Sequence, residues 1–181
     1  MRVLATYNIK GGVGKTSSTV NLAYLAAKQG FRTLVWDLDP QGAATFYFRI
    51  KPKVKGGGKK LISGKTELNS RIKATDFPGL DLLPADFSYR HLDLELDNTK
   101  RPEKQIDKIL RPLSRDYELL FLDCAPSISL VSESVFRAAD VLLVPTIPTP
   151  LSLRTLLQIL RSVEEVKTKQ LGVFPFFCMV D

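Results

Sequence analysis

The chain has 181 residues, of which 44% are hydrophobic and 25% are charged, and its formal net charge is +7. A chain of this size can bury a sizeable core and is most simply a single domain spanning residues 1–181. It has no run of about 18 apolar residues, so no transmembrane segment is expected. The N-terminus, MRVLATYNIKGG, lacks the features of a signal peptide, which predicts a cytoplasmic protein. Cys124 and Cys178 have no CxxC or histidine partners, so we expect two buried free thiols.

The positive charge is concentrated in one stretch, KPKVKGGGKKLISGK, which covers residues 51–65. Six lysines lie in it without an acidic residue: Lys51, Lys53, Lys55, Lys59, Lys60 and Lys65. Three consecutive glycines and few large apolar residues predict a mobile, exposed basic loop. A solvated loop and a contact with a phosphate backbone are the two interpretations of its charge.

The hydrophobic pattern predicts strands that alternate with helices along the chain. Strands are expected at residues 3–7, 33–37, 80–83, 119–123, 141–145 and 172–180, and helices at 16–29, 103–113, 130–139 and 151–169. Strands that are apolar throughout are typical of a parallel sheet covered on both faces. The predicted fold class is therefore α/β, a doubly wound, mostly parallel sheet with helices on both faces. No helix follows the last expected strand to cover the sheet, so we expect the native chain to continue beyond Asp181.

A glycine-rich loop, KGGVGKTS, lies between the first expected strand and the first expected helix. Glycines without a Cβ let the backbone adopt positive φ angles and bring amide groups close to a polyphosphate at the amino end of the helix. In such a loop Lys15 neutralises the β and γ phosphates, Thr16 offers a hydroxyl to Mg²⁺, and Ser17 contacts the α phosphate or caps amides. The expected nucleotide-binding residues are Gly11, Gly12, Val13, Gly14, Lys15, Thr16 and Ser17.

The loop departs from the ordinary pattern G-x-x-x-x-G-K-[ST], because position 9 is Ile9 and a second lysine, Lys10, precedes the glycines. The segment KGGVGKT resembles the deviant Walker A motif KGGxGK[ST]. DLDPQG, residues 37–42, resembles the DxDPQG element of the ParA/Soj partition ATPases. YELLFLDCAPSIS and AADVLLVPTIPTPLSLRTL resemble two further segments of that family. On these motifs the chain is identified as a member of the ParA/Soj family, within the MinD/ParA superfamily of P-loop NTPases.

The resemblance implies roles for four residues. Lys10 would cross to the partner's nucleotide in an ATP-sandwich dimer, where a cation offsets the repulsion between two facing nucleotides. Asp123, at the Walker B position, would hold Mg²⁺ through a water, and Asp37 would help to order the Mg²⁺ shell. Asp39 would orient the attacking water. The expected catalytic residues are thus Lys10, Lys15 and Asp39, and the expected metal residues are Thr16, Asp37 and Asp123.

The segment CAPS, residues 124–127, would be switch II, which senses the γ phosphate. Two positions differ from the family's common residues: Ala125 stands where proline is common, and Ala43 stands where asparagine is common. These differences concern the detail of the switches and not the class of protein.

The resemblance implies a slow Mg²⁺-dependent ATPase that acts as a switch in plasmid or chromosome partitioning. Such a protein dimerises on ATP, binds DNA non-specifically at the nucleoid, and is stimulated by a ParB-like protein. The family's usual DNA-binding residues would lie beyond Asp181. Within the chain the candidates are residues 51–65, Arg154, Arg161, Lys167 and Lys169.

Three alternatives remain open at this point. A MinD-like positioning ATPase, recruited to membrane or protein cargo, needs a C-terminal amphipathic helix, and the DPQG element argues against it. The iron-sulfur electron-transfer branch of the superfamily needs interface cysteines, which Cys124 and Cys178 do not match. A non-hydrolysing scaffold would release no phosphate from ATP, with or without DNA.

Overall fold

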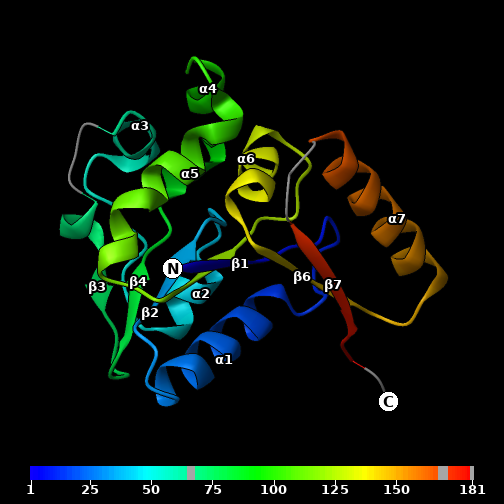
Figure 1. Cartoon of the computed structure of the whole chain (residues 1–181), viewed down its shortest axis with the longest axis horizontal. Coiled ribbons are helices and arrows are strands. Elements are labelled where there is room, and N and C mark those ends of the chain that lie inside the picture. The colour runs from blue at the N-terminus through cyan, green and yellow to red at the C-terminus, as the bar shows by residue number, and fades with distance from the viewer. Residues whose placement is uncertain (65–67, 167–170, 180–181) are drawn as a thin grey trace.

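The computed structural model describes residues 1–64, 68–166 and 171–179, and their strands form one seven-stranded sheet (Figure 1). The strands are β1 Arg2–Thr6, β2 Thr33–Asp37, β3 Lys73–Ala74, β4 Leu80–Leu83, β5 Leu119–Asp123, β6 Val141–Thr146 and β7 Gly172–Phe177. Their order is β3-β4-β2-β5-β1-β6-β7, and every pair is parallel except β3 with β4. The doubly wound α/β fold expected from the sequence is therefore confirmed.

Helices connect the parallel strands. The α-helices are α1 Lys15–Lys28, α2 Ala43–Tyr47, α3 Gly57–Ile62, α4 Leu92–Asp97, α5 Gln105–Leu110, α6 Leu130–Ala138 and α7 Pro150–Glu165. Short 3-10 turns lie at η1 Asn69–Arg71, η2 Phe87–His91, η3 Pro102–Lys104 and η4 Arg111–Arg115. Helix α1 stops where Gly30 takes φ 95°, which lets the amides of residues 29–31 bond back to the last carbonyls of the helix.

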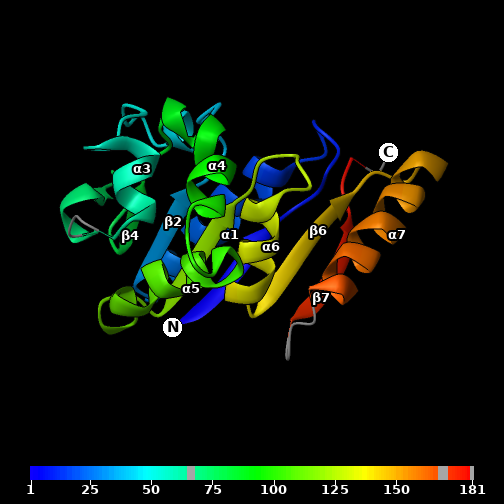
Figure 2. The same cartoon turned by 90° about the horizontal axis from the view of Figure 1, so that it is seen from above.

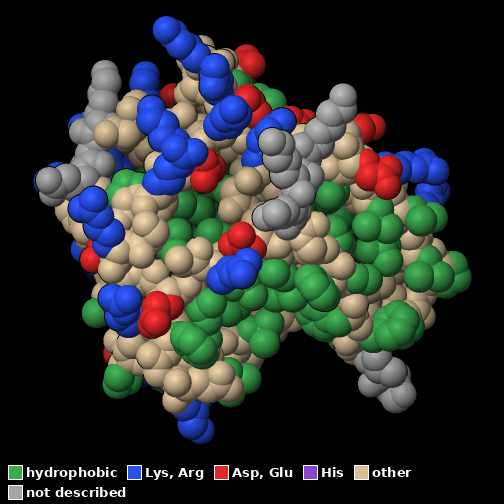
Figure 3. Space-filling model, viewed as in Figure 1, with side chains coloured by type: hydrophobic (Ala, Val, Ile, Leu, Met, Phe, Trp, Pro, Cys, Tyr) green, Lys and Arg blue, Asp and Glu red, His purple; other side chains and the backbone are tan. Residues whose placement is uncertain are grey.

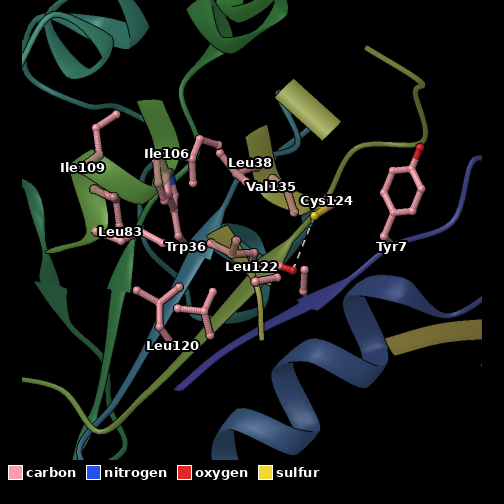
Figure 4. Close-up of a cluster of buried hydrophobic side chains, with 14 of the residues drawn as sticks. Tyr7, Trp36, Leu38, Leu83, Ile106, Ile109, Leu120, Leu122, Cys124 and Val135 are labelled. Atoms are coloured by element: carbon pink, nitrogen blue, oxygen red, sulfur yellow. Dashed lines mark hydrogen bonds between the residues drawn. The ribbon is translucent and has the colours of Figure 1, made fainter. Parts of the chain in front are cut away.

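The core has two layers, one on each face of the sheet. On one face α1 and α2 pack against strand residues such as Val35 and Phe121. On the other face residues of α3 to α7 pack against the intervening positions, such as Trp36 and Leu122. Figure 4 shows Trp36 and Leu122 in this second layer, together with Val135 of α6. Because successive strand side chains point to opposite faces, strands buried on both faces must be apolar throughout.

The elements α2, α4 and β3 were not expected from the sequence, and two further segments have another conformation than expected. Residues 103–113 do not form one helix, since α5 covers only Gln105–Leu110 between the 3-10 turns η3 and η4. Pro102 and Pro112 lie in these turns, and proline lacks the amide that a continuous helix needs. Residues 57–62, expected in a loop, form α3, because Leu61 and Ile62 are buried in the core against the segment that precedes α4.

The sheet ends at β7, which pairs with β6 and with no other strand among the residues described. Phe174 and Phe177 of β7 are 56% and 64% exposed. Figure 2 shows β7 and α7 together at one end of the molecule, and Figure 3 shows hydrophobic side chains gathered over α1 and β7. Among the described residues, no helix therefore covers β7 on the face of the sheet that carries α1. Helix α7 ends at Glu165 and β7 ends at Phe177, so both are shorter than the expected ranges 151–169 and 172–180. Residues 167–169 and 180 of those ranges lie outside the described residues.

Candidate functional site

The carboxyl ends of three neighbouring strands lie at one level. Thr6 of β1 pairs with Asp123 of β5, and Asp123 pairs with Asp37 of β2. All three residues are buried, with exposures of 0%, 1% and 0%. The glycine-rich loop leaves β1 at this edge, so the sheet brings both carboxylates next to it. Ligands of open α/β sheets bind at this edge.

The glycine-rich loop has the backbone that its sequence predicts. Gly12 and Gly14 have φ angles of 72° and 91°, which only glycine adopts without strain. A Cβ added to Gly11 or Gly12 would meet no atom within 4 Å, so the loop faces open space. The first bond at the start of α1 runs from the Ser18 amide to the Gly14 carbonyl (2.9 Å), which leaves the preceding amides without helical partners. These amides and the helix dipole favour a bound anion.

Two buried side chains that the sequence reasoning missed hold the loop in place. Asn8 donates through Nδ2 to the Pro145 carbonyl (2.8 Å) and accepts the Lys10 amide at Oδ1 (2.9 Å). Tyr7 donates its hydroxyl to the Ser127 carbonyl (2.8 Å), which ties the end of β1 to the expected switch II. Their position between an apolar strand and the glycine-rich loop was the one feature of the sequence that could have indicated this role.

Lys15 is 8% exposed and donates from Nζ to the Lys10 carbonyl (3.0 Å). Burial lowers the pKa of its ammonium group, and the carboxylates of Asp123 and Asp39 act in the opposite direction. The Lys15 ammonium is therefore held inside the glycine-rich loop by a main-chain carbonyl of the same loop. By contrast, the Lys10 ammonium makes no hydrogen bond or ion pair with any residue that the structure describes.

Asp123 is a buried carboxylate with an unused oxygen. Its Oδ1 lies 3.4 Å from the Thr19 hydroxyl, whose single proton it shares with the Lys15 carbonyl, and its Oδ2 has no hydrogen-bond partner among the described residues. Burial and the nearby Asp37 raise its pKa to about 7, and the charge of Lys15 opposes this shift. Thr19 also was missed; it lies one helical turn after Lys15 and donates to the Lys15 carbonyl (3.0 Å). An unpaired buried acceptor of this kind suits a cation or its bound water.

Asp37 is occupied by bonds to its own chain. Its Oδ2 accepts the amide (2.8 Å) and the hydroxyl (2.7 Å) of Thr45, and its Oδ1 accepts the Asp39 amide (3.2 Å). Burial raises its pKa to about 6, and the bonds from Thr45 oppose this shift. Asp37 thus positions α2 and the turn that carries Asp39, and its expected place in the Mg²⁺ shell stays a prediction.

Asp39 forms the turn between β2 and α2. Its Oδ1 accepts the Gln41 amide (2.9 Å), and its carbonyl accepts the Gly42 amide (2.9 Å). Its side chain is partly exposed, and its charge acts on both Lys15 and Asp123. The structure therefore brings Lys15, Asp37, Asp39 and Asp123 together at the carboxyl edge of the sheet.

The two thiols flank the same edge of the sheet. Cys124 is 5% exposed and its Sγ lies 3.7 Å from the Leu122 carbonyl (dashed in Figure 4). Cys178 follows β7, and its Sγ lies 3.5 Å from where a Cβ of Gly14 would stand. Both are free, as expected, although Cys178 is only partly buried.

Comparison with known proteins identifies the family. A family model described as an AAA domain matches residues 1–173. The chromosome partitioning protein ParA of Caulobacter vibrioides is 32% identical over 170 residues, which cover 92% of this chain and 64% of the relative. The chain belongs to the ParA/Soj-type partition ATPases. The sporulation initiation inhibitor protein Soj of Bacillus subtilis is also 32% identical, over 92% of this chain and 66% of Soj.

Solved structures resemble this ParA/Soj-type chain over its whole length. Cobyrinic acid a,c-diamide synthase of Mycobacterium smegmatis, solved with ADP and magnesium, has a TM-score of 0.92 at 30% identity and covers 100% of this chain and 76% of its own. A plasmid partition protein of Borrelia burgdorferi has a TM-score of 0.89 at 22% identity, and the match covers 99% of this chain and 80% of that protein. At this identity the similarity shows a shared fold alone.

This ParA/Soj-type chain spans slightly less than two thirds of the length of the curated relatives. Among the residues that the structure describes, no helix has the length and apolar character needed to cross a bilayer.

Proposed function

We propose that this chain carries the catalytic machinery of a Mg²⁺-dependent ATPase that dimerises on ATP and works as a switch in DNA partitioning. The observation that carries the proposal is the arrangement at the end of β1. There the ammonium group of Lys15 lies within a loop of left-handed glycines, and the carboxylate of Asp123 keeps one buried oxygen unpaired.

The residues present fit a nucleotide and Mg²⁺. Open space over Gly11 and Gly12 and the free amides that follow suit an anionic phosphate chain. Thr16 and Asp123 would hold the metal, which neutralises the charge that develops on the β and γ phosphates. Among the described residues, no group of three or more His, Cys, Asp or Glu forms a metal cage. Mg²⁺ fits such a site because it is commonly bound by one or two carboxylates together with substrate phosphates.

Each residue then has a part in hydrolysis. The loop amides and Lys15 bind the phosphates, and a water attacks the γ phosphorus in line with the bond to ADP. That bond breaks, and ADP and phosphate leave. Asp39 would accept a hydrogen bond from the water and orient it, because its carboxylate is partly exposed and close enough to act on Lys15. Asp37 keeps Asp39 in place because the carboxylate of Asp37 accepts a hydrogen bond from the main-chain amide of Asp39.

Lys10 is proposed to act on the nucleotide of a second subunit. Its main chain is held by Asn8 and Lys15, whereas its ammonium is free of partners among the described residues. A lysine held at its backbone but free at its charge can reach a neighbouring subunit. Two facing nucleotides repel each other, and a cation from each side offsets that repulsion.

The role in partitioning follows from the family and not from the site. We propose non-specific DNA binding on the nucleoid, within the cytoplasm, and stimulation by a ParB-like protein. ParA of Caulobacter vibrioides, named for chromosome partitioning, supports this assignment. Because the chain covers only part of that relative, DNA and partner contacts outside these 181 residues belong to the proposal.

The test is phosphate release from Mg²⁺-ATP, measured with and without duplex DNA, beside light scattering with ATP. We expect release above the level of the Lys15→Ala variant and a dimer that forms only with ATP. Release equal to that of the variant under both conditions would identify a non-hydrolysing scaffold. Sedimentation with anionic vesicles but no binding to DNA would identify a MinD-like positioning ATPase instead.

A further inference from the structure

A second basic site lies away from the glycine-rich loop, in a cavity of about 530 Å³ beside β3. Five cationic side chains line it: Lys51, Lys53, Lys55, Arg71 and Lys73. None of the described residues that line it is acidic. Since like charges repel, a cavity lined in this way is unfavourable unless an anion enters it.

Arg71 makes the cavity different from an ordinary basic surface. It ends the 3-10 turn η1, and only 2% of the residue is exposed. None of its three guanidinium nitrogens has a hydrogen-bond partner, and it forms no ion pair with the described residues. Burial of an unpaired charge is strongly unfavourable. Native proteins rarely keep such a group without a use for it.

The geometry points to a phosphate ligand. The planar guanidinium donates through a fork of N–H groups that matches two oxygens of one phosphate, and lysines add point charges around it. Five cations exceed the charge of a single phosphate group, which favours a ligand with several phosphates. The lysines are exposed, whereas the guanidinium nitrogens of Arg71 are buried beneath the surface, so a phosphate would first meet the lysines and would reach Arg71 when that side chain turns outward.

We propose that this cavity, the Arg71 pocket, is an anion site that binds phosphate groups of a polyanion, separately from the nucleotide site. Two sources share this chemistry: a free polyphosphate and the phosphodiester backbone of a nucleic acid. If the backbone is the ligand, the pocket rests on the DNA binding proposed above and gives it a place in the fold; it requires neither ATP hydrolysis nor dimerisation. It assigns a specific role to part of the basic stretch 51–65, namely Lys51, Lys53 and Lys55.

The experiment measures binding of two probes to the whole chain in the presence of excess Mg²⁺-ADP. Calorimetry with inorganic tripolyphosphate tests the free source, and anisotropy of a labelled 20-base-pair duplex tests the backbone. The variant is Arg71→Gln, and the matched control is Arg115→Gln, which removes the same charge from an exposed residue outside the pocket. A failure of ADP to bind would count against the nucleotide site alone, because the glycine-rich loop is the same in Arg71→Gln and Arg115→Gln and their comparison does not depend on ADP.

We expect Arg71→Gln to weaken at least one probe by tenfold or more, while Arg115→Gln stays within twofold of the wild type. If the backbone is the ligand, DNA affinity falls and the slope of log K against log salt drops by about one. If free polyphosphate is the ligand, only the tripolyphosphate affinity falls. Unchanged affinities for both probes, or equal losses in Arg71→Gln and Arg115→Gln, would overturn the proposal.

A second variant covers the case in which Arg71→Gln does not fold. Lys51→Gln, Lys53→Gln and Lys73→Gln together leave Arg71 in place and change only exposed side chains. We expect this variant to lose at least threefold more affinity than a control in which the exposed residues Lys28, Lys100 and Lys108 become glutamine. Equal losses in the two triple variants would show a general charge effect and would refute the pocket.

Discussion

Thr45 donates both its amide (2.8 Å) and its hydroxyl (2.7 Å) to the same oxygen of Asp37. The same hydroxyl accepts the amide of Ala85 (2.9 Å) after β4. All three residues are fully buried, with exposures of 0%. One side chain therefore joins the end of β2, the first turn of α2 and the segment after β4, directly beside the proposed site.

Thr45→Val should destabilise the fold by about 2–4 kcal/mol, because it removes a bond to a buried carboxylate and leaves the Ala85 amide unpaired. Urea unfolding measures the change. Thr155→Val is the matched control: this buried threonine donates only to the Leu151 carbonyl of its own helix, and its loss should cost much less. Equal costs would show that the bonds of Thr45 have no special role.

Lys10→Ala should abolish ATP hydrolysis and leave nucleotide binding nearly unchanged, since the Lys10 ammonium has no partner among the described residues. Titration with a fluorescent ATP analogue and a phosphate-release assay separate the two properties. Lys15→Ala, by contrast, should lose binding as well. A similar loss of binding in Lys10→Ala would contradict an action on the partner's nucleotide.

Asp39→Ala should slow hydrolysis and prolong the ATP-bound dimer, because the water would lose the carboxylate that orients it. Light scattering with Mg²⁺-ATP and a single-turnover assay report the two effects. We expect a rate loss of about 10²–10⁴-fold, the usual contribution of a positioned general base. A variant that stays monomeric with ATP, or hydrolyses at the wild-type rate, would count against this role.

Asp86 provides a pH test away from the proposed metal site. Burial raises its pKa, but hydrogen bonds from Ser88 and Val54 outweigh burial and hold it below its usual value. A depressed folded-state pKa adds stability that is present at neutral pH and is lost as pH falls through that pKa. Asp86→Asn should therefore cost about 1–3 kcal/mol at pH 7, and the difference from the wild type should narrow toward pH 3.5.

Urea unfolding at several pH values checks this prediction. Asp97→Asn serves as the control because Asp97 is exposed at the end of α4. It should change stability little at any pH. A cost of Asp86→Asn that does not vary with pH would show that its charge is not the source of the stabilisation.

The sequence was sufficient wherever one local pattern decides the conformation. The predicted ranges 33–37, 80–83 and 119–123 match β2, β4 and β5 residue for residue, because short, mainly apolar runs are typical of strands buried on both faces. The glycine-rich loop was equally readable, since positive φ at Gly12 and Gly14 requires glycine itself.

The tertiary structure decided what depends on partners far along the chain. Nothing local shows that Asp37 is occupied by Thr45, or that Asn8 reaches the Pro145 carbonyl, 137 residues away. Helix α3 has too few residues to be stable alone, and it forms because Leu61 and Ile62 find a buried site. The lack of a hydrogen-bond partner for the Arg71 guanidinium among the described residues likewise becomes visible only in the folded chain. Backbone conformation and apolar pattern are local properties, whereas burial and the pairing of polar groups depend on the whole fold.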